Sequence, residues 1–454
     1  MNHQKANRIT ACFFLAALLT GCGRRSVITI EPGTGDFGAR LTDAMRACPP
    51  SVACWIDARK ITGAQASAES IVFDRALTTI QVGFSSLTLA PGKQLEIRAN
   101  YVTIEGPSFL VSAVKCQGSP CMSIHDAYAP TLRDIGFLPV SSSAVGIEIR
   151  NARGPAALLE RISVEGFSEV ALKVLDGSWT WTVEDSQFVK SGEGIEFLGD
   201  QANAWKFNRN LINGNTHAGV MIRLCDYPSS YGGCTTNGMV FSDENQFEGN
   251  ETAFRIVNGS IYNLDVRDSY AELTRSNTGF LVAQNDGQPN TQLRISGLLV
   301  SGGGGYVNGG VPIYTLDTSK GYSLPPVPAA GIECGGGNCT VTTQVPHGLT
   351  CSNQHGFLLC PYVHMVSANA AQDITAKITS IVDPQKFTFF LNGARSGTGG
   401  TVAYAPDLIN AIVQNQKWDS SWTAPPMVQS TGATLATSNN SVLDGLGHLV
   451  QDNK

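Results

Sequence analysis

Four charged side chains recur at one position of a strand pattern that repeats along the middle of the chain. In each copy an apolar residue is followed by a variable one, and the variable residues are Glu148, Lys173, Glu196, Met221, Arg255 and Leu281. Because side chains alternate between the two faces of a strand, these residues would point outward, with neighbours about 4.8 Å apart. Such a ladder can bind an acidic or neutral glycan, or it can pair with itself at about 0–1 kcal/mol per pair.

Catalytic candidates gather around this ladder. Glycoside hydrolysis needs two carboxylates, about 5–5.5 Å apart for retention or 6.5–9.5 Å for inversion, and Glu196 with Asp226 could supply them. A lyase instead needs a base that removes the proton beside a sugar carboxylate, and a cation that neutralises that carboxylate. The side chains that could serve a lyase are Lys173, Arg223, Arg255 and His217. Both reactions are open to these residues.

An inserted loop at residues 225–234 follows the ladder directly. It carries Asp226 and two tyrosines, and rigid loops with aromatic side chains beside a groove are common binding devices. Two positions beyond the ladder the strands place Arg150, Arg223 and Val257. The residues expected to contact the substrate are Glu148, Arg255, Tyr227 and Tyr231.

The strands that must position these groups recur about every 24 residues. One strand type has its first apolar residues at 147, 172, 195, 220, 254 and 280, and a second type begins at Trp181, Trp205, Met239 and Tyr262. Both series contain one step of 34 residues, so a single turn carries the insertion that holds the 225–234 loop. Turns this short cannot bury their inner faces alone, whereas stacked turns can.

Two further positions in each turn have structural roles. We expect the residues that begin the second strand type to form an interior stack rather than exposed platforms for sugars. A short polar residue follows that strand, and the four examples are Ser186, Asn210, Asn245 and Asp268. Asn and Asp tolerate left-handed backbone and bond to neighbouring backbone groups, so this position suits a sharp corner.

These strands, together with Tyr101-Val102-Thr103-Ile104-Glu105-Gly106, resemble the pectate-lyase-like superfamily of right-handed parallel β-helices over roughly residues 33–325. Gly35-Asp36-Phe37-Gly38 is similar to the start of the helix that caps the first turn in that superfamily. The resemblance implies an all-β solenoid with a helical N-terminal cap and a substrate groove along the ladder. Activity does not follow, because one fold hosts many functions. The polygalacturonase-like signatures Asn-Thr-Asp, Gly-Asp-Asp, Gly-His-Gly and Arg-Ile-Lys are absent.

No cofactor or metal is indicated by the sequence. The Asp-rich calcium cluster of pectate lyases is missing, and the His residues are scattered without metal-ligand spacing. Calcium binding is possible only because the chain resembles the pectate-lyase-like superfamily.

The C-terminal third departs from the repeat. Residues 306–330 end in the linker Leu324-Pro325-Pro326-Val327-Pro328. Residues 331–405, with Val341-Thr342-Thr343 and Lys386-Phe387-Thr388, are similar to a small β-barrel module of phage tail and bacterial surface proteins. His347 lies in a Pro-His-Gly-Leu turn of that module, where a structural role is expected.

The chain therefore divides into five predicted parts. They are a signal peptide at 1–22, a cap with the first turns at 33–110, the β-helix at 111–325, the small module at 331–405, and a C-terminal segment at 406–454. We expect that last segment to hold a docking strand and to be partly disordered.

The N-terminus has the pattern of a lipoprotein signal peptide. Lys5 and Arg8 precede an apolar run at 9–19, which is too short for a stable membrane span of about 20 residues. The run ends in Leu19-Thr20-Gly21-Cys22, which resembles the bacterial lipobox, so Cys22 is the expected lipidation site. Gly23 rather than Asp follows, which favours the outer membrane in a Gram-negative host.

The remaining cysteines agree with export. Ten of them form five local pairs, which is typical of disulfides in an oxidising compartment. The expected pairs are Cys48 with Cys54, Cys116 with Cys121, Cys225 with Cys234, Cys334 with Cys339, and Cys351 with Cys360.

The charge balance narrows the partners. A net charge of −6, with no basic run after the first 25 residues, argues against nucleic acid. Three functions remain open: an exported enzyme that cleaves a polysaccharide, a non-catalytic glycan-binding or adhesive lipoprotein, and a structural surface protein without a ligand. The first is preferred, with a polysaccharide as partner and the membrane contacted through the lipid alone. The assembly is a monomer or a homotrimer.

Overall fold

The structure is a computed structural model. It describes residues 25–227 except Ser142, and residues 235–301 except 259, 262, 273–278 and 285–290. Beyond residue 301 it describes mainly strands up to Asn453, and for residues 409–453 only the backbone arrangement. The signal peptide and Cys22 lie outside the described residues, so lipidation stays a prediction.

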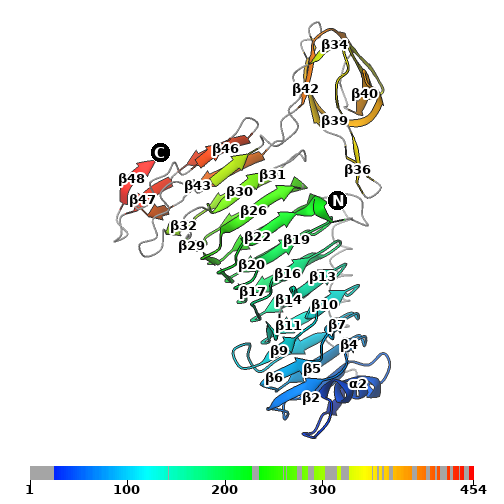
Figure 1. The fold of residues 1–454 in the computed structure, drawn as a ribbon, viewed down its shortest axis with the longest axis vertical. Helices are drawn as coiled ribbons and strands as arrows, with labels where there is room; N and C mark the ends of the chain where they lie inside the picture. Colours follow the sequence, from blue (N-terminus) through cyan, green and yellow to red (C-terminus); the bar gives the residue numbers. More distant parts are fainter. Residues whose placement is uncertain are drawn as a thin grey trace, which may run out of the picture.

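Three long sheets form the sides of a solenoid (Figure 1). Sheet A contains β1 (Ser26–Thr29), β2 (Cys54–Ala58), β5 (Thr78–Val82), β8 (Thr103–Glu105), β11 (Thr131–Arg133), β14 (Arg153–Glu160), β17 (Trp179–Glu184), β20 (Trp205–Asn208), β24 (Met239–Ser242), β28 (Leu264–Arg267), β31 (Thr291–Ser296), β43 (Ile409–Gln414) and β46 (Ala433–Ser438). Sheet B contains β3 (Ala64–Ser67), β6 (Ser86–Leu89), β9 (Ala113–Cys116), β12 (Gly136–Pro139), β15 (Ser163–Glu165), β18 (Gln187–Val189), β21 (Leu211–Asn213), β25 (Gln246–Glu248), β29 (Tyr270–Glu272), β32 (Leu299–Ser301), β44 (Lys417–Asp419), β47 (Asn440–Leu443) and β48 (Leu449–Asn453).

Sheet C is the side that carries the predicted ladder. It contains β4 (Ile71–Phe73), β7 (Leu95–Ile97), β10 (Met122–His125), β13 (Val145–Arg150), β16 (Val170–Val174), β19 (Glu193–Phe197), β22 (Ala218–Arg223), β26 (Thr252–Asn258), β30 (Leu281–Gln284), β33 (Tyr314–Asp317) and β45 (Met427–Gln429). Within sheet C, β10, β13, β16 and β19 pair in parallel, so each strand pairs with the strand three places later in the chain. This is the pattern that a stack of three-sided turns requires. The expected all-β parallel β-helix is confirmed.

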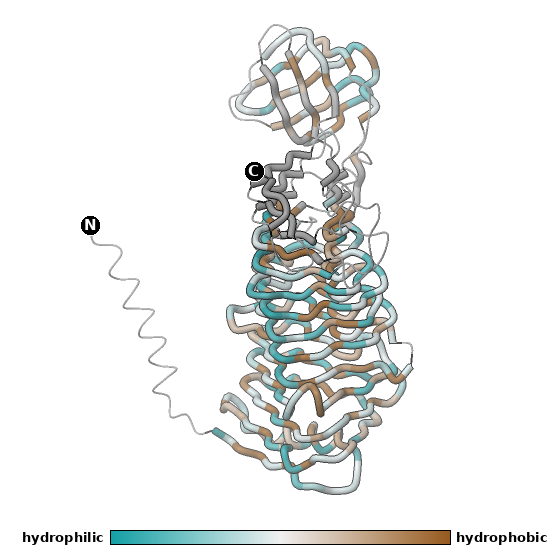
Figure 2. Tube along the Cα trace, turned by 90° about the vertical axis from the view of Figure 1, so that its left-hand side faces the viewer, coloured by the Kyte–Doolittle hydropathy of each residue, from teal (hydrophilic) through white to brown (hydrophobic). Residues whose placement is uncertain are grey.

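One apolar core runs through the described turns of the solenoid, from Ile30 to Tyr314. Side chains from all three sheets point inward and are buried, as the alternating pattern predicts, and Figure 2 shows the apolar positions recurring turn after turn. Trp181 and Trp205 lie at its centre with ring centroids 5.5 Å apart and planes 9° from parallel. The indole Nε1 of Trp205 donates to the Ser178 carbonyl at 2.7 Å, so its one polar group is satisfied. The interior stack is therefore confirmed over Trp181, Trp205 and Met239.

The alignment of the turns after the insertion needs correction. Met239 pairs with Leu264 in the register of sheet A, so Leu264 rather than Tyr262 continues the interior stack. Tyr262 itself lies outside the described residues. Likewise Gln246 pairs with Tyr270, which places Ser269 rather than Asp268 in the corner position of Asn245.

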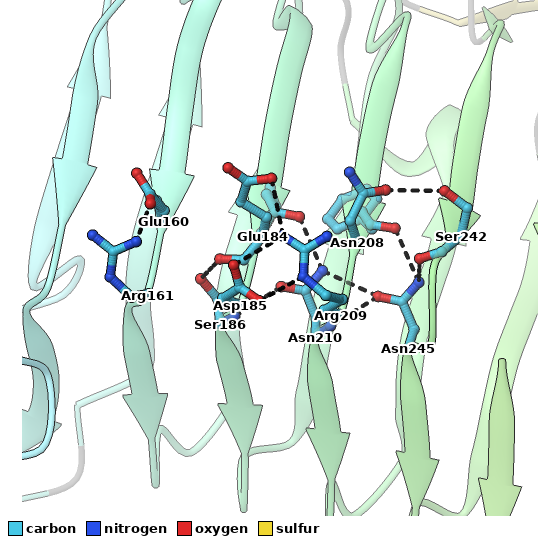
Figure 3. A network of polar contacts seen from close by, with 12 residues as sticks. Glu160, Arg161, Glu184, Asp185, Ser186, Asn208, Arg209, Asn210, Ser242 and Asn245 are labelled. Atoms are coloured by element: carbon cyan, nitrogen blue, oxygen red, sulfur yellow. Dashed lines mark hydrogen bonds and ion pairs between the residues drawn. The ribbon is translucent and has the colours of Figure 1, made fainter.

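The corner between sheets A and B is held by a ladder of amides (Figure 3). The backbone N–H of Ser186 donates to Asn210 Oδ1, and that of Asn210 donates to Asn245 Oδ1, both at 3.1 Å. The left-handed residues are the preceding ones, and those with φ between 52° and 65° are Asp185, Arg209 and Glu244. The polar residue therefore satisfies backbone groups of the bend, while its neighbour takes the strained conformation.

Helix α2 (Phe37–Ala47) closes the N-terminal end, as expected. The Asp36 carboxylate caps it by accepting from the Ala39 N–H at 2.7 Å, and it also accepts from Ala68 N–H at 2.5 Å. The buried side chains of Phe37 and Leu41 then cover the apolar core of the first turn. An uncapped end would expose that core to water.

A separate antiparallel sheet interrupts the solenoid. It contains β34 (Val327–Gly335), β35 (Asn338–Thr343), β38 (Tyr362–Ser367), β39 (Gln372–Asp383), β40 (Lys386–Phe390), β41 (Gly397–Thr398) and β42 (Thr401–Tyr404), with a hairpin of β36 (Ser352–Gln354) and β37 (Phe357–Leu359). His347 is buried there; its Nδ1 accepts from Leu349 N–H and its Nε2 contacts the Asp383 carbonyl at 3.0 Å. Such bonds fit the structural role expected for His347.

The segment after this module belongs to the β-helix. β43 pairs in parallel with β31, β44 with β32, and β45 with β33, so residues 409–429 add a turn to the same three sheets. β46 and β47 extend them further. These pairings extend the β-helix beyond residue 325, where the sequence predicted a docking strand, and the predicted disorder within residues 406–454 stays a prediction.

Three of the expected disulfides are present: Cys48–Cys54, Cys116–Cys121 and Cys334–Cys339. Cys351 is also disulfide-bonded, while Cys360 lies outside the described residues. The expected Cys225–Cys234 bridge falls on Cys234 and a Cys225 side chain that are likewise not described. In the described part of the chain, no helix is long and apolar enough to cross a membrane.

Candidate functional site

The outer face of sheet C, called the ladder face below, carries the predicted charges. Strand register places in one row Glu96, Ser123, Glu148, Lys173, Glu196, Met221, Arg255 and Val282. Leu281 is not in this row, because it pairs with Phe254 and its side chain is buried in the core. That placement corrects the outward position predicted for Leu281.

Glu196 is the centre of the ladder face. Although it points away from the core, its side chain is fully buried beneath its neighbours. Arg223 Nε donates to Glu196 Oε1 at 2.5 Å, and Lys173 Nζ lies 3.9 Å from Oε2. Among the described residues nothing donates a hydrogen bond to Oε2. A buried carboxylate oxygen without a donor is rare, because desolvation is then uncompensated.

Arg223 reaches Glu196 from the end of the next turn. Burial alone would lower the pKa of Arg223, but the charge of Glu196 and its hydrogen bond raise it. A bulge between Ile222 and Arg223 pairs Arg223 with Asn258, so Val257 does not extend the row as predicted. Arg223 faces outward two residues after Met221 on β22, and this places its guanidinium beside the carboxylate.

Glu193 lies three residues before Glu196 on the same strand. Its neighbours in register are the apolar Val170 and Ala218, and its side chain is nearly buried. His217 Nδ1 is 3.6 Å from Glu193 Oε1, too far for a hydrogen bond. Burial, and then the charge of Glu196, raise the pKa of Glu193.

Two carboxyl groups on one strand thus have different surroundings. Glu196 is flanked by two cations, whereas Glu193 sits in an apolar setting that favours its protonated form. Carboxyl pairs with such unequal surroundings are typical of acid–base sites. Asp226, the predicted second carboxylate, is exposed and lies on the short helix η1 (Leu224–Asp226) after β22. Its catalytic role stays a prediction.

Replacing Glu193 with glutamine is expected to change the pH dependence of stability. A folded-state pKa above the unfolded value makes the wild-type chain lose stability as the pH rises from about 4.3 through the pKa of Glu193. The loss is about 1.4 kcal/mol for each unit by which folding raises that pKa. In urea unfolding at pH 4 and pH 8, the stability of the wild type relative to Glu193→Gln should fall by this amount as the pH rises.

Glu244→Gln is the matched control, because Glu244 is exposed on another side of the solenoid. Its free energy of unfolding should follow the wild type at both pH values. An equal pH dependence in Glu193→Gln and the wild type would contradict the assignment.

Tyr227, near the start of the inserted loop, contacts the turns that precede it. Arg150 on β13 donates a hydrogen bond to the hydroxyl of Tyr227, which raises the pKa of Arg150. The Tyr227 ring also passes beside Gly199, where an added Cβ would lie 3.1 Å from Tyr227 Cδ1. Tyr227 therefore spans the turns from β22 back to β13 along the edge of the ladder face. Tyr231 lies outside the described residues.

A second polar cluster at the N-terminal end of the ladder face was not predicted. His125 contacts Glu96 through Nε2 and Asp126 through Nδ1, the latter at 3.0 Å, and Arg98 contacts Glu96 at 2.6 Å. Burial alone would raise the pKa of Glu96, but hydrogen bonds from Arg98 and His125 lower it. The signal was present in the strands Leu95-Glu96-Ile97 and Met122-Ser123-Ile124-His125, whose alternation matches the repeat.

The structure thus brings together Lys173, Glu196 and Arg223, and places His217 beside Glu193 rather than beside Glu196. Glu148 and Arg255 occupy the same row, and each lies two turns away from Glu196. In the described part of the chain, no group of three or more His, Cys, Asp or Glu side chains could hold a metal ion. The arrangement suits proton transfer and the binding of polar or anionic groups.

Comparison with known proteins gives one group of structural neighbours. No protein-family model and no curated protein matches the sequence. A tailspike variant of E. coli bacteriophage HK620, solved with a pentasaccharide, has 11% identity and a TM-score of 0.36 over 83% of this chain and 91% of that chain. The Acinetobacter phage vB_ApiP_P1 tailspike has 10% identity and a TM-score of 0.34, covering 83% and 86%. The Dettilon tailspike has 11% identity and a TM-score of 0.29 over 83% of this chain and 93% of that chain. Values this low say nothing about activity.

Proposed function

We propose that this parallel β-helix chain is an exported, lipid-anchored protein that binds an extracellular polysaccharide along the ladder face. The observation that carries the proposal is the pair of partly exposed cations, Lys173 and Arg223, that stand beside the buried carboxylate of Glu196. Their side chains are 22% and 38% exposed, so each can donate to a sugar hydroxyl or carboxylate that lies on the ladder face.

Acidic sugars are the favoured ligands. Lys173 and Arg223 stand beside Glu196, and Arg150 and Arg255 lie further along the same face. Glu196 holds the first two side chains in place, so little conformational entropy is lost when they bind an anion. A sugar carboxylate is an anion of the size that such a pair can hold.

Lys173→Met is expected to weaken glycan binding about tenfold or more, which corresponds to about 1.4 kcal/mol. The measurement is affinity electrophoresis of residues 23–454 in gels that contain polygalacturonate, alginate or dextran. Lys206→Met is the matched control, because Lys206 is an exposed lysine on the outer side of sheet A. If the glycan-containing gel retards Lys173→Met and Lys206→Met equally, Lys173 does not bind the glycan and the proposed site on the ladder face is contradicted.

Cleavage is the second candidate function, and Glu193 favours it. A nearly buried carboxyl group with a raised pKa can give its proton to a leaving glycosidic oxygen, while Glu196 acts as the anionic partner. Glu193→Gln should then lower the release of reducing ends about 100-fold or more and retain binding. Release of unsaturated sugars would favour a lyase, and no turnover with binding retained would favour the non-catalytic alternative.

Export and lipidation are proposed from the lipobox alone. Cys22→Ser should abolish incorporation of labelled palmitate and leave the folded β-helix unchanged. Incorporation of label into the variant would contradict Cys22 as the modified residue.

A further inference from the structure

A column of exposed side chains follows the corner between sheets C and A. Tyr101, Tyr128, Arg153 and Trp179 stand on four successive turns, and the three aromatic residues are 49%, 36% and 37% exposed. Tyr101 N–H donates to the Tyr128 carbonyl at 2.7 Å, Tyr128 bridges to Arg153, and Arg153 pairs with Trp179. Three steps of roughly 4.8 Å make this aromatic column about 14 Å long.

The side chains of the aromatic column contact one another. The rings of Tyr101 and Tyr128 meet edge to face, with centroids 5.4 Å apart. The Arg153 guanidinium lies 5.2 Å from the centroid of the Trp179 ring. Gly154 leaves room for the Tyr128 ring, since an added Cβ would lie 3.2 Å from its carbons. The rings are therefore held in place before any ligand arrives.

Tyr101 stands at a corner position whose backbone is left-handed in one turn after another. Its φ is 57°, and Leu77, Ala129, Thr180 and Ala204 at the same position have φ between 51° and 62°, so this conformation belongs to the fold. The fold does not require a large ring there, because Ala129 and Ala204 fill the position in other turns. The Tyr101 side chain, 49% exposed, is therefore available for contact with a ligand.

Polar groups border the aromatic column. Toward sheet C lie Asp126 and Asn151, joined by a hydrogen bond of 2.6 Å. Beyond Trp179 the corner continues with Asn203, whose Oδ1 accepts from the Asn237 N–H at 2.8 Å. A strip one residue wide between amides and a carboxylate is too narrow for a stable protein interface, which buries about 800 Å² on each partner. It suits a thin extended chain with apolar ring faces and hydroxyl edges.

We propose that the aromatic column binds an extended polysaccharide chain as a second track, beside the ladder face. That the ligand is a polysaccharide rests on the proposed function. The binding of that ligand to the aromatic column is the new inference. Pyranose rings present flat C–H faces to the aromatic rings, and their hydroxyl groups reach the bordering amides and Asp126. The column adjoins the ends of β10, β13 and β16, so one glycan chain can contact both surfaces.

The test uses the double variant Tyr101→Ala/Trp179→Ala of residues 23–454. In gels containing polygalacturonate or dextran we expect its affinity to fall about tenfold or more. The control is Leu110→Ala/Val140→Ala, which removes one exposed apolar side chain from each of the two other corners of the solenoid. Its affinity should equal that of the wild type. Both variants should unfold at the wild-type urea concentration, apart from a small change at Tyr101.

The outcomes separate the two proposals. If the double variant binds like the wild type while Lys173→Met does not, the aromatic column is overturned and the ladder face stands. If size-exclusion chromatography shows that the double variant changes the assembly without changing glycan affinity, the column is a contact between copies and the inference is overturned. If the wild-type chain binds neither glycan, both proposals fail together.

Discussion

Replacing Arg223 with methionine is expected to lower the free energy of unfolding by about 3 kcal/mol at pH 7, measured by urea titration. The loss arises from Glu196, whose carboxylate is fully buried and would keep only Lys173, 3.9 Å from its other oxygen. Removing one partner of a buried pair leaves an uncompensated charge, which costs more than the pair itself contributes. About 3 kcal/mol is the lower end of that effect, because Arg223 is 38% exposed and water can partly replace it.

Arg209→Met provides the matched control for this prediction. Arg209 also bonds to a carboxylate of the preceding turn, at 2.7 Å, but Asp185 is itself exposed (Figure 3). Exposed pairs are worth about 0–1 kcal/mol, so the control should lose no more than that. The two variants differ mainly in the burial of the carboxylate that is left behind.

A second substitution tests the cause of the loss. Adding Glu196→Gln to Arg223→Met removes the buried charge that lacks its arginine, so it should recover most of the loss at pH 7. Equal losses for Arg223→Met and Arg209→Met at pH 7 would refute the account of Glu196 as a buried partner.

Much of the fold could be predicted because each turn repeats one burial pattern. Ile147, Leu172, Ile195 and Val220 lie in register as expected. After the inserted loop the alignment failed at Tyr262 by two residues, an error that alternation with a period of two cannot detect. It failed at Leu281 by one residue, because Phe280, Leu281 and Val282 are all apolar and show no alternation. The loop lengths that would settle the register are irregular in that region.

The C-terminal turn could not be predicted for a different reason. The Pro-rich linker at residues 324–328 signals the end of a segment, so the 24-residue step from Ile409 to Ala433 was not linked to the repeat before it. The pairings of β43 with β31, β44 with β32 and β45 with β33 show that the chain returns to the same sheets. Contacts between strands more than 100 residues apart in sequence leave no local pattern to detect.

The site was predicted in part. Outward alternation correctly placed Lys173 and Glu196 in one row, but it could not reveal that Glu196 is buried beneath Arg223. The importance of Glu193 was also missed, since Gly194 breaks the alternation. An added Cβ on Gly194 would meet Ile212 in the core, so Gly194 and Ile195 both face inward and Glu193 joins Glu196 outside.

Trp205→Ala is expected to destabilise the chain by about 3–5 kcal/mol, as a cavity in the middle of the core requires. Trp205 is fully buried, stacks at 5.7 Å on Phe207 as well as on Trp181, and meets Phe197 edge to face. Each neighbour belongs to the same turn or the one before, so the cavity would weaken contacts between two adjacent turns. The measurement is the free energy of unfolding in urea.

Trp179→Ala is the matched control for Trp205→Ala, because it removes an exposed tryptophan from the preceding turn of the same sheet. Trp179 stands in sheet A one turn before Asn203 and two residues before Trp181, yet its ring is on the outside. Its loss should change stability by no more than about 1 kcal/mol. If both variants lost the same stability, Trp179 would be a structural residue, and its exposure could no longer be ascribed to ligand binding. A large loss for Trp205 alone would separate the tryptophans that build the solenoid from the one available to a glycan.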